Sequence, residues 1–453
     1  MTGAARPASA RVKPWDFPTV ERDALPNGVR LVVAPMHRLP LVTVIALVDA
    51  GASGEVVGSE GVAALTARTL AEGTGALDGI ALVERFEALG TSFEAWADWD
   101  STTARFTVLP ERLADAMSQF AEVIRWPAFP VPDVARRREE RVADLAQQRA
   151  DPRALADHRF VGALYASDSR FALPVGGNER SVAGLEAEVV RRFHANRYGP
   201  SNTTLVIVGD CTAERARSLA LAGFGDWRAA PTSAAARPAV GAAEGRRTVI
   251  VRKADAPQSE LRLGHVGVPR RHPDHLAIVV MNAILGGLFS SRLNLNLRER
   301  NAFTYGASSG FDWRRGAGPF VVSTAVKNEV TGRAVEEILR EIDAMRATPP
   351  SREEVSLATE YLAGVFPIRF ETTAAVAGAL AGATTHGLPD DWFATYRDQV
   401  QRIDAATVHA AAREHLAPER IVLLAVGDPK TIESPLAALG HGPLTVRDAH
   451  EES

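Results

Sequence analysis

The chain has 453 residues, which is too long for one ordinary domain and fits two or three. Hydrophobic residues make up 46% and charged residues 23%, the balance of a globular protein, and the formal net charge of -4 gives no reason to expect nucleic acid as a partner. The single cysteine, Cys211, excludes an internal disulfide and a four-cysteine zinc site.

The N-terminal stretch MTGAARPASARVKPWDFP has no apolar segment of the kind found in secretory signals. We therefore expect a cytoplasmic protein by default, with a periplasmic location left open. No apolar run approaches the roughly 20 residues that a membrane-spanning helix needs, so we expect no membrane partner.

The first half mixes strand and helix patterns. Apolar runs predict strands over 28–35 and 41–51, and an amphipathic helix is predicted over 60–71. The stretch 90–110 alternates aromatic and β-branched residues around the sequence DWDS and predicts a hairpin. Two long helices are predicted after it, over 111–126 and 134–151. Short turns between strands favour an α+β sandwich on a largely antiparallel sheet over a doubly wound parallel sheet.

The second half repeats the first at a fixed offset. YGPSNTTLVIVGD ends at Asp210 and LAPERIVLLAVGD ends at Asp428, so the offset is 428 − 210 = 218 residues. The strand openings at 28–35 and 246–253 fit the same offset. Agreement at both ends indicates an internal duplication.

The repeat predicts the domain organisation. We expect an N-terminal domain over 15–227 and a homologous C-terminal domain over 248–440. The stretch 228–247 between them is rich in Ala, Pro and Gly and is predicted to be a linker. The two halves would then form a clamshell.

The motifs of common active sites are missing from the sequence. It contains no nucleophile elbow, phosphate loop, H-x-x-E-H or H-E-x-x-H. The close pair His272 and His275 could share a metal on one helix face, but it straddles a Pro at a helix start, which favours a solvated turn. The remaining histidines in helical or loop contexts are isolated and are expected to be structural: His158, His194, His386 and His415.

A second stretch of interest, 286–311, reads GGLFSSRLNLNLRERNAFTYGASSGF. Arg298 offers a rigid fork of hydrogen-bond donors and Tyr305 a phenolic donor. Taken alone, the stretch predicts a helix end whose arginines extend to solvent and a half-buried tyrosine.

Taken together, these stretches resemble the M16 (pitrilysin/insulysin-like) metallopeptidases in their short form, over nearly the whole chain. The sequence GVAALTARTLAEGT at 61–74 matches the flanks of the family's catalytic helix, roughly G-x-A-H-F-L-E-H-M-x-F-x-G-T. The resemblance implies two homologous α+β domains per chain, in agreement with the repeat.

The resemblance also implies that the zinc site is lost. Ala64 and Arg68 stand at the two zinc-binding histidines, and Ala67 stands at the general-base glutamate. Asp144 stands at the third ligand, a glutamate, 144 − 68 = 76 residues further on. Two methyl groups and a guanidinium supply neither ligands nor a base, so we expect no metal there. We expect Asp144 to form an ion pair with Arg68.

The stretch 286–311 takes on a different meaning within this family. Arg298 and Tyr305 match an Arg and a Tyr seven residues apart that hold the substrate near the scissile bond. The resemblance implies that Arg298 anchors the substrate and that Tyr305 positions its carbonyl group. It also makes 94–99 the counterpart of the edge strand that pairs with peptide in active members, although two bulky tryptophans there fit hairpin packing equally well.

The profile implies a non-catalytic, substrate-binding subunit of a heterodimeric zinc peptidase. The expected partner is an M16 chain with an intact H-x-x-E-H, which would carry the zinc, and we expect no cofactor in this chain. The alternative is a proteolytically inactive scaffold or peptide-binding protein of the same fold. An enzyme with a different mechanism finds no nucleophile–base pair to support it.

Overall fold

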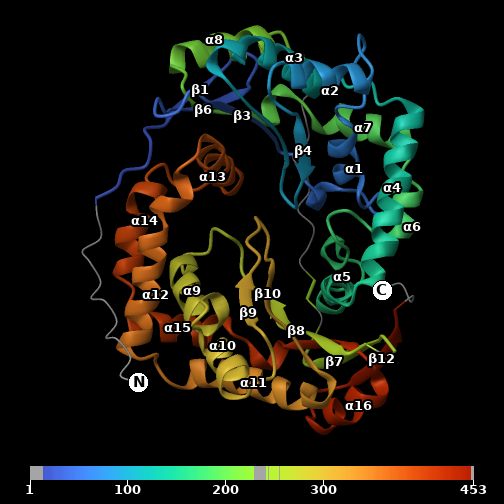
Figure 1. Ribbon diagram of the computed structural model, residues 1–453, viewed down its shortest axis with the longest axis vertical. Helices are drawn as coiled ribbons and strands as arrows, with labels where there is room; N and C mark the ends of the chain where they lie inside the picture. Colours follow the sequence, from blue (N-terminus) through green and yellow to red (C-terminus); the bar gives the residue numbers. More distant parts are fainter. Residues whose placement is uncertain (1–13, 229–240, 243, 255, 450–453) are drawn as a thin grey trace.

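A computed structural model describes residues 14–228, 241–242, 244–254 and 256–449. Within these residues the chain forms two six-stranded sheets, each with helices packed on it (Figure 1). The predicted linker, 228–247, lies mostly outside the described residues.

The first sheet has the strand order β1-β2-β6-β3-β5-β4. The β2–β6 pair is parallel and the other pairs are antiparallel. The strands are β1 (Glu21–Ala24), β2 (Arg30–Pro35), β3 (Val42–Val48), β4 (Glu94–Ala97), β5 (Thr102–Val108) and β6 (Thr203–Gly209).

The second sheet has the order β12-β7-β11-β8-β10-β9. Its β7 strand pairs in parallel with β11 and β12, and the remaining pairs are antiparallel. The strands are β7 (Arg247–Arg252), β8 (Gln258–Val266), β9 (Ala307–Phe311), β10 (Pro319–Lys327), β11 (Val422–Gly427) and β12 (Leu444–Asp448). The predicted α+β fold with largely antiparallel sheets is therefore confirmed.

The helices of the first half are α1 (Val62–Thr69), α2 (Gly79–Ala88), α3 (Leu113–Arg125), α4 (Val131–Ala150), α5 (Pro152–Leu164), α6 (Glu179–Ala183), α7 (Ala187–Arg197) and α8 (Ala213–Phe224). Those of the second half are α9 (His275–Asn282), α10 (Arg292–Asn294), α11 (Thr331–Ala347), α12 (Arg352–Val365), α13 (Thr373–His386), α14 (Trp392–Gln401), α15 (Ala405–His415) and α16 (Pro429–Ala438). Two π-helical segments, η5 (Ala283–Gly287) and η6 (Leu295–Arg300), flank α10.

The internal repeat is visible in the topology. The order β2-β6-β3-β5-β4 of the first sheet returns as β7-β11-β8-β10-β9 in the second. Helix α7 spans 187–197 and α15 spans 405–415, and both ends differ by the predicted 218 residues. The predicted hairpin over 90–110 is present as β4 and β5, joined at residues 98–101.

Each half gives one helix to the sheet of the other. Helix α5 of the first half packs its Leu155 and Phe160 against β7 and β11 of the second sheet. Helix α13 of the second half packs Val376 and Leu380 against β2, β3 and β6 of the first sheet. Shifting α5 by 218 gives 370–382, which overlaps α13, so the exchanged helices are equivalent copies.

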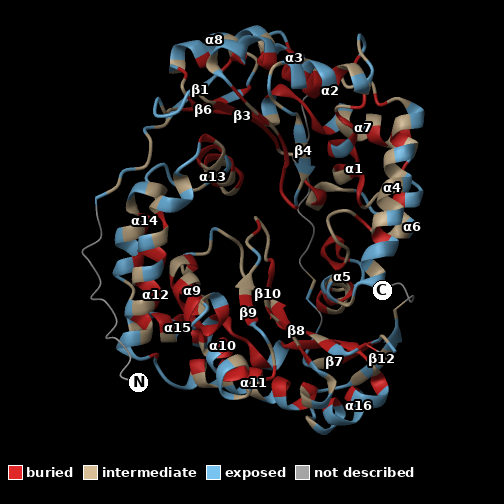
Figure 2. Ribbon diagram, in the orientation of Figure 1, coloured by how far each residue is buried: buried red, intermediate tan, exposed pale blue. Residues whose placement is uncertain are grey.

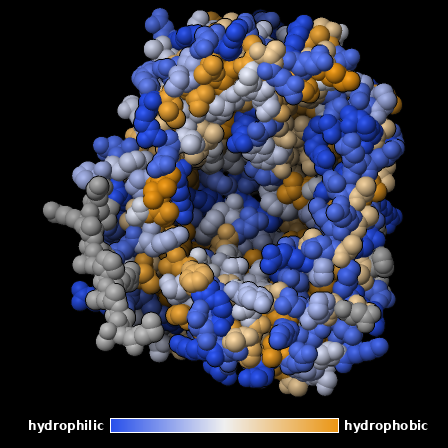
Figure 3. Space-filling model, in the orientation of Figure 1, coloured by the Kyte–Doolittle hydropathy of each residue, from blue (hydrophilic) through white to orange (hydrophobic). Residues whose placement is uncertain are grey.

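This exchange follows from the apolar pattern of the central strands. Both faces of β6 and β11 are fully buried, so a helix layer on one face leaves a second apolar face to cover. The halves are therefore interlocked through both cores and not joined by the linker alone, as the clamshell expected from the sequence had it. Figure 2 shows the buried residues concentrated where helices meet the sheets, and Figure 3 shows a hollow between the two halves.

One helical segment, His275–Arg300, is long and apolar enough by length and composition to cross a membrane. More than half of its apolar window, 56%, is buried inside the protein. Its apolar residues pack in the core of the second half, which is the behaviour of a core helix.

Candidate functional site

Helix α1 begins on a buried carboxylate. Gly61 precedes the helix with φ 97°, a left-handed conformation that favours glycine. The Glu55 carboxylate accepts hydrogen bonds from the backbone N–H of Gly61 at 3.1 Å and of Ala63 at 2.8 Å. A negative charge at a helix N-terminus is favourable. Arg170, itself buried, donates to Glu55 at 2.6 Å, while burial raises the pKa of Glu55.

The four positions of the expected zinc site come together where α1 crosses α4. Ala67 is buried and Ala64 is half-buried on α1. Arg68 Nη1 lies 3.2 Å from Asp144 Oδ2 on α4, so the predicted ion pair is present. The site that holds a metal in the family's active helix is here closed by a pair of opposite side-chain charges.

This arrangement cannot hold a three-ligand zinc ion. Catalytic zinc takes three protein ligands, and these four residues supply one carboxylate and no imidazole. A second guanidinium lies close by, since the charge of Arg68 contributes to lowering the pKa of Arg141, after burial as the larger cause. Positive charge at this position disfavours a cation.

A cleft opens beside the pair, between α1, α4 and strand β4. Arginines and acids on its wall are already matched, because buried Glu72 accepts from Arg136 at 2.6 Å and also from Arg137. The cleft is lined by Ala67, Arg68, Glu72, Val83, Phe93, Ala95, Arg136 and Arg137, among others. Its floor is polar and charge-balanced.

Strand β4 is an edge strand, as the counterpart of a peptide-pairing strand must be. It pairs with β5 alone, with Glu94 opposite Arg105, and the two side chains form an ion pair at 2.7 Å. Of the two tryptophans in 94–99, Trp96 is exposed and lies under the Arg105 guanidinium. Trp99 is buried against Phe171 and packs in the core, so only Trp96 burdens the edge.

Arg298 and Tyr305 lie in one segment that leads from η6 to β9. The Arg298 guanidinium stacks on exposed Phe289, with its central carbon 3.6 Å from the ring centre, and donates to Glu299 at 2.8 Å. Tyr305 is 95% exposed, two residues before β9 starts. The family-free expectation of a half-buried tyrosine is therefore wrong, because no core residue covers this turn.

The histidines divide in an unexpected way. His275 is buried between Trp313 and Trp392, and burial lowers its pKa to about 3, so it is no ligand partner of His272. His272 instead lies beside His415, which the sequence indicated as isolated. The two are 143 positions apart, and no local spacing could have joined them.

Comparison with known proteins identifies the family. The family model described as insulinase (peptidase family M16) matches residues 32–168, and the model described as the peptidase M16 inactive domain matches residues 184–362. The chain belongs to the M16 peptidase family, as a member of its short form.

Curated relatives and solved structures agree with this assignment. An uncharacterized zinc protease of Mycobacterium bovis is 26% identical over 374 residues, 82% of this chain and 80% of the relative. One from Mycobacterium leprae is 27% identical over 64% of this chain and 65% of its own length. The crystal structure of a peptidase M16 inactive domain from Pseudomonas fluorescens matches with a TM-score of 0.84 and 26% identity, over 90% of this chain and 98% of that one.

Proposed function

We propose that this chain is the zinc-free, substrate-binding subunit of a two-chain M16 peptidase. In this proposal a partner M16 chain with an intact H-x-x-E-H holds the zinc and its water, and this chain adds Arg298 and Tyr305 to the shared site. The observation that carries it is the contrast between the two halves. The zinc positions are closed by the Arg68–Asp144 pair, whereas Tyr305 stands 95% exposed.

An exposed tyrosine at this place is costly unless something binds it. Its phenol neither packs on the core nor, among the described residues, finds a hydrogen-bond partner. A phenolic O–H presented beside the free edge of β9 is suited to donate to a peptide carbonyl and to the oxyanion that develops on it. Arg298 has the matching charge, but it must first leave Glu299 and Phe289.

The proposal is tested on the reconstituted complex of this chain with its zinc-bearing partner. Tyr305→Phe removes one hydroxyl from an exposed side chain, and we expect kcat to fall by about 10²–10³-fold, as for other lost oxyanion donors. Arg298→Ala is expected to raise KM more than it lowers kcat, because it anchors substrate. Tyr361→Phe, at another exposed tyrosine, is the matched control and is expected to leave both constants unchanged.

Unchanged turnover in Tyr305→Phe, with the complex intact by size-exclusion chromatography, would show that no composite site exists. The same conclusion follows if the partner alone cleaves peptides as fast as the complex.

A peptide-binding scaffold is the second candidate, and the free edge of β4 favours it. Strand β4 pairs on one side only and borders the charge-balanced cleft, so a peptide could add there as a further strand without hydrolysis. A neighbouring gene for an M16 chain with H-x-x-E-H would favour the first candidate, and its absence would favour this one.

A further inference from the structure

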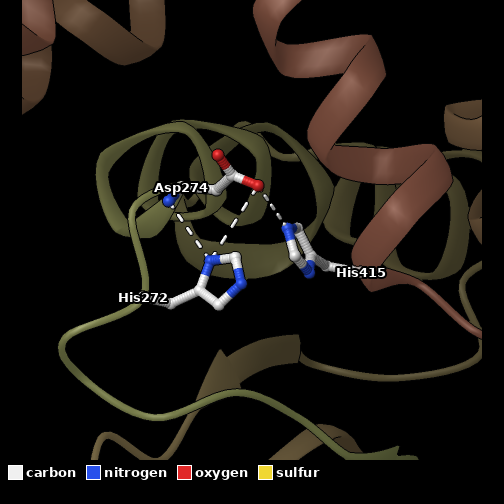
Figure 4. A group of neighbouring side chains, drawn as sticks. All are labelled: His272, Asp274 and His415. Carbon is white, nitrogen blue, oxygen red and sulfur yellow. Dashed lines mark hydrogen bonds and ion pairs between the residues drawn. The ribbon is translucent and has the colours of Figure 1, made fainter.

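A group of three potential metal ligands lies in the C-terminal half, far in sequence from the degenerate zinc positions. His272 lies in the turn before α9, Asp274 is the residue that precedes α9, and His415 is the last residue of α15 (Figure 4). One ligand atom from each residue falls within 4.8 Å of the others. We propose that these three residues bind one divalent transition-metal ion of the zinc type.

The chemistry of the set selects the class of ion. Imidazole nitrogen suits zinc, nickel, copper and cobalt, whereas calcium and magnesium prefer all-oxygen sites. Two imidazoles and one carboxylate match the three protein ligands of an open zinc site, in which the fourth position is left to water. Asp274 and His272 are partly exposed, so solvent can reach that position.

The distances fit a metal after small movements. His415 Nε2 lies 2.8 Å from Asp274 Oδ2, and His272 Nδ1 lies 3.9 Å from the same oxygen. Ligand atoms around a tetrahedral zinc with bonds of 2.0–2.2 Å are about 3.3–3.5 Å apart. One contact must open and the other close by roughly half an ångström, which side-chain rotation in a partly exposed turn allows.

The residues are prepared for binding to different degrees. His415 is buried and its ring is held by the hydrogen bond that it donates to Asp274. His272 Nδ1 accepts the Asp274 backbone N–H at 3.2 Å, a weak bond that a metal would replace or that leaves Nε2 for the ion. The preceding arginine nearest in sequence with a known contact, Arg270, stacks on Trp392 at 4.6 Å.

The simple alternative is that Asp274 and His415 only tie two helices together. That contact explains His415, but it gives no reason for a second imidazole, edge to face with the first at 4.8 Å between ring centres. A bound ion would use all three residues and would clasp the start of α9 to the end of α15. Since α9 continues through η5 and α10 to η6, which carries Arg298, the clasp lies at the base of the segment used in the proposed function.

The test uses the full chain alone, stripped of metal and titrated with Zn²⁺ against a chromophoric chelator, and with Co²⁺ followed by its visible absorption. We expect one equivalent per chain and at least a tenfold weaker affinity in both His272→Ala and Asp274→Asn. His37→Ala is the matched control, because His37 and Asp210 form a similar pair at 2.7 Å on the surface. It is expected to bind as the wild type does. Zinc is also expected to raise Tm in the wild type and the control only.

Absence of binding in the wild type overturns the proposal, as does an affinity left unchanged by either variant. If a variant does not fold, X-ray absorption on the zinc-loaded wild type decides instead: two imidazoles support the site, and fewer refute it. Because no partner chain is used, failure here leaves the proposed composite site untouched.

Discussion

Arg68 Nη1 on α1 lies 3.2 Å from Asp144 Oδ2 on α4, so two positions that bind zinc in the family bind each other in this chain. The helices keep the frame of the metal site although the ligands are gone. An exposed ion pair of this kind contributes about 0–1 kcal/mol, so the frame does not depend on it. The helices are held by packing and by the buried carboxylate at the start of α1.

The preserved frame predicts that the site can be rebuilt. Ala64→His, Arg68→His and Asp144→Glu together place two imidazoles and a carboxylate at the family's positions, and we expect the chain to gain one zinc ion. The measurement is zinc content after dialysis, made in a His272→Ala background so that the site proposed near α9 does not contribute. Arg68→Ala with Asp144→Glu, which lacks both imidazoles, is the control. No added zinc in the triple variant would mean that the helices have moved apart.

The two ion pairs near α1 should differ strongly in their effect on stability. Glu55→Ala leaves Arg170 buried and unpaired and removes the acceptor for two backbone N–H groups, and we expect a loss of about 3–5 kcal/mol. Asp144→Ala breaks an exposed pair and is expected to cost less than about 1 kcal/mol. Urea unfolding of the two variants gives both values. Equal losses would contradict the assignment of Glu55 as the anchor of α1.

The exchanged helices predict that both halves unfold together. Phe160→Ala removes a buried ring of the first half from the core of the second sheet, and we expect a loss of about 3–5 kcal/mol. The same change at exposed Phe289 is expected to fall within about 0.5 kcal/mol of the wild type. Fluorescence and circular dichroism should report one shared transition. Two separate transitions, with only the first half shifted, would refute the interlocked arrangement.

The turn between β4 and β5 predicts an unusual dependence on pH. Burial raises the pKa of Asp98 above 3.8, so the folded state holds a proton that the unfolded state releases. Its contribution to stability is therefore largest below that value and is lost as the pH rises through the folded pKa. Asp98→Asn keeps an oxygen for the N–H groups of Asp100 and Ser101, which Asp98 now accepts at 2.8 and 2.7 Å.

We expect Asp98→Asn to be at least as stable as the wild type at pH 7 and to show a weaker decline of stability between about pH 4 and 7. Denaturant unfolding at a series of pH values measures both. Asp78→Asn, at an exposed helix cap, is the control and should not flatten that decline. A loss above about 1 kcal/mol at pH 7 in Asp98→Asn would show that the buried charge itself is needed.

Local pattern carried much of the fold. Apolar periodicity placed the hairpin and α1, and the 218-residue offset predicted a topology that β6 and β11 repeat to the residue at their ends. It worked because alternation and helical spacing are properties of neighbouring residues. The exposure of Tyr305 was missed for the opposite reason, since burial depends on what distant segments cover.

The sequence by itself determined what the chain lacks and how often its design occurs: the residues at 64, 67 and 68 offer no zinc ligand, and the strand pattern is written twice. Only the tertiary structure decided that α5 and α13 change places, that Arg68 meets Asp144, and that His272 meets His415. Composition and spacing are local, whereas these contacts join residues 76 or more positions apart and arise only when apolar faces on both halves are buried together.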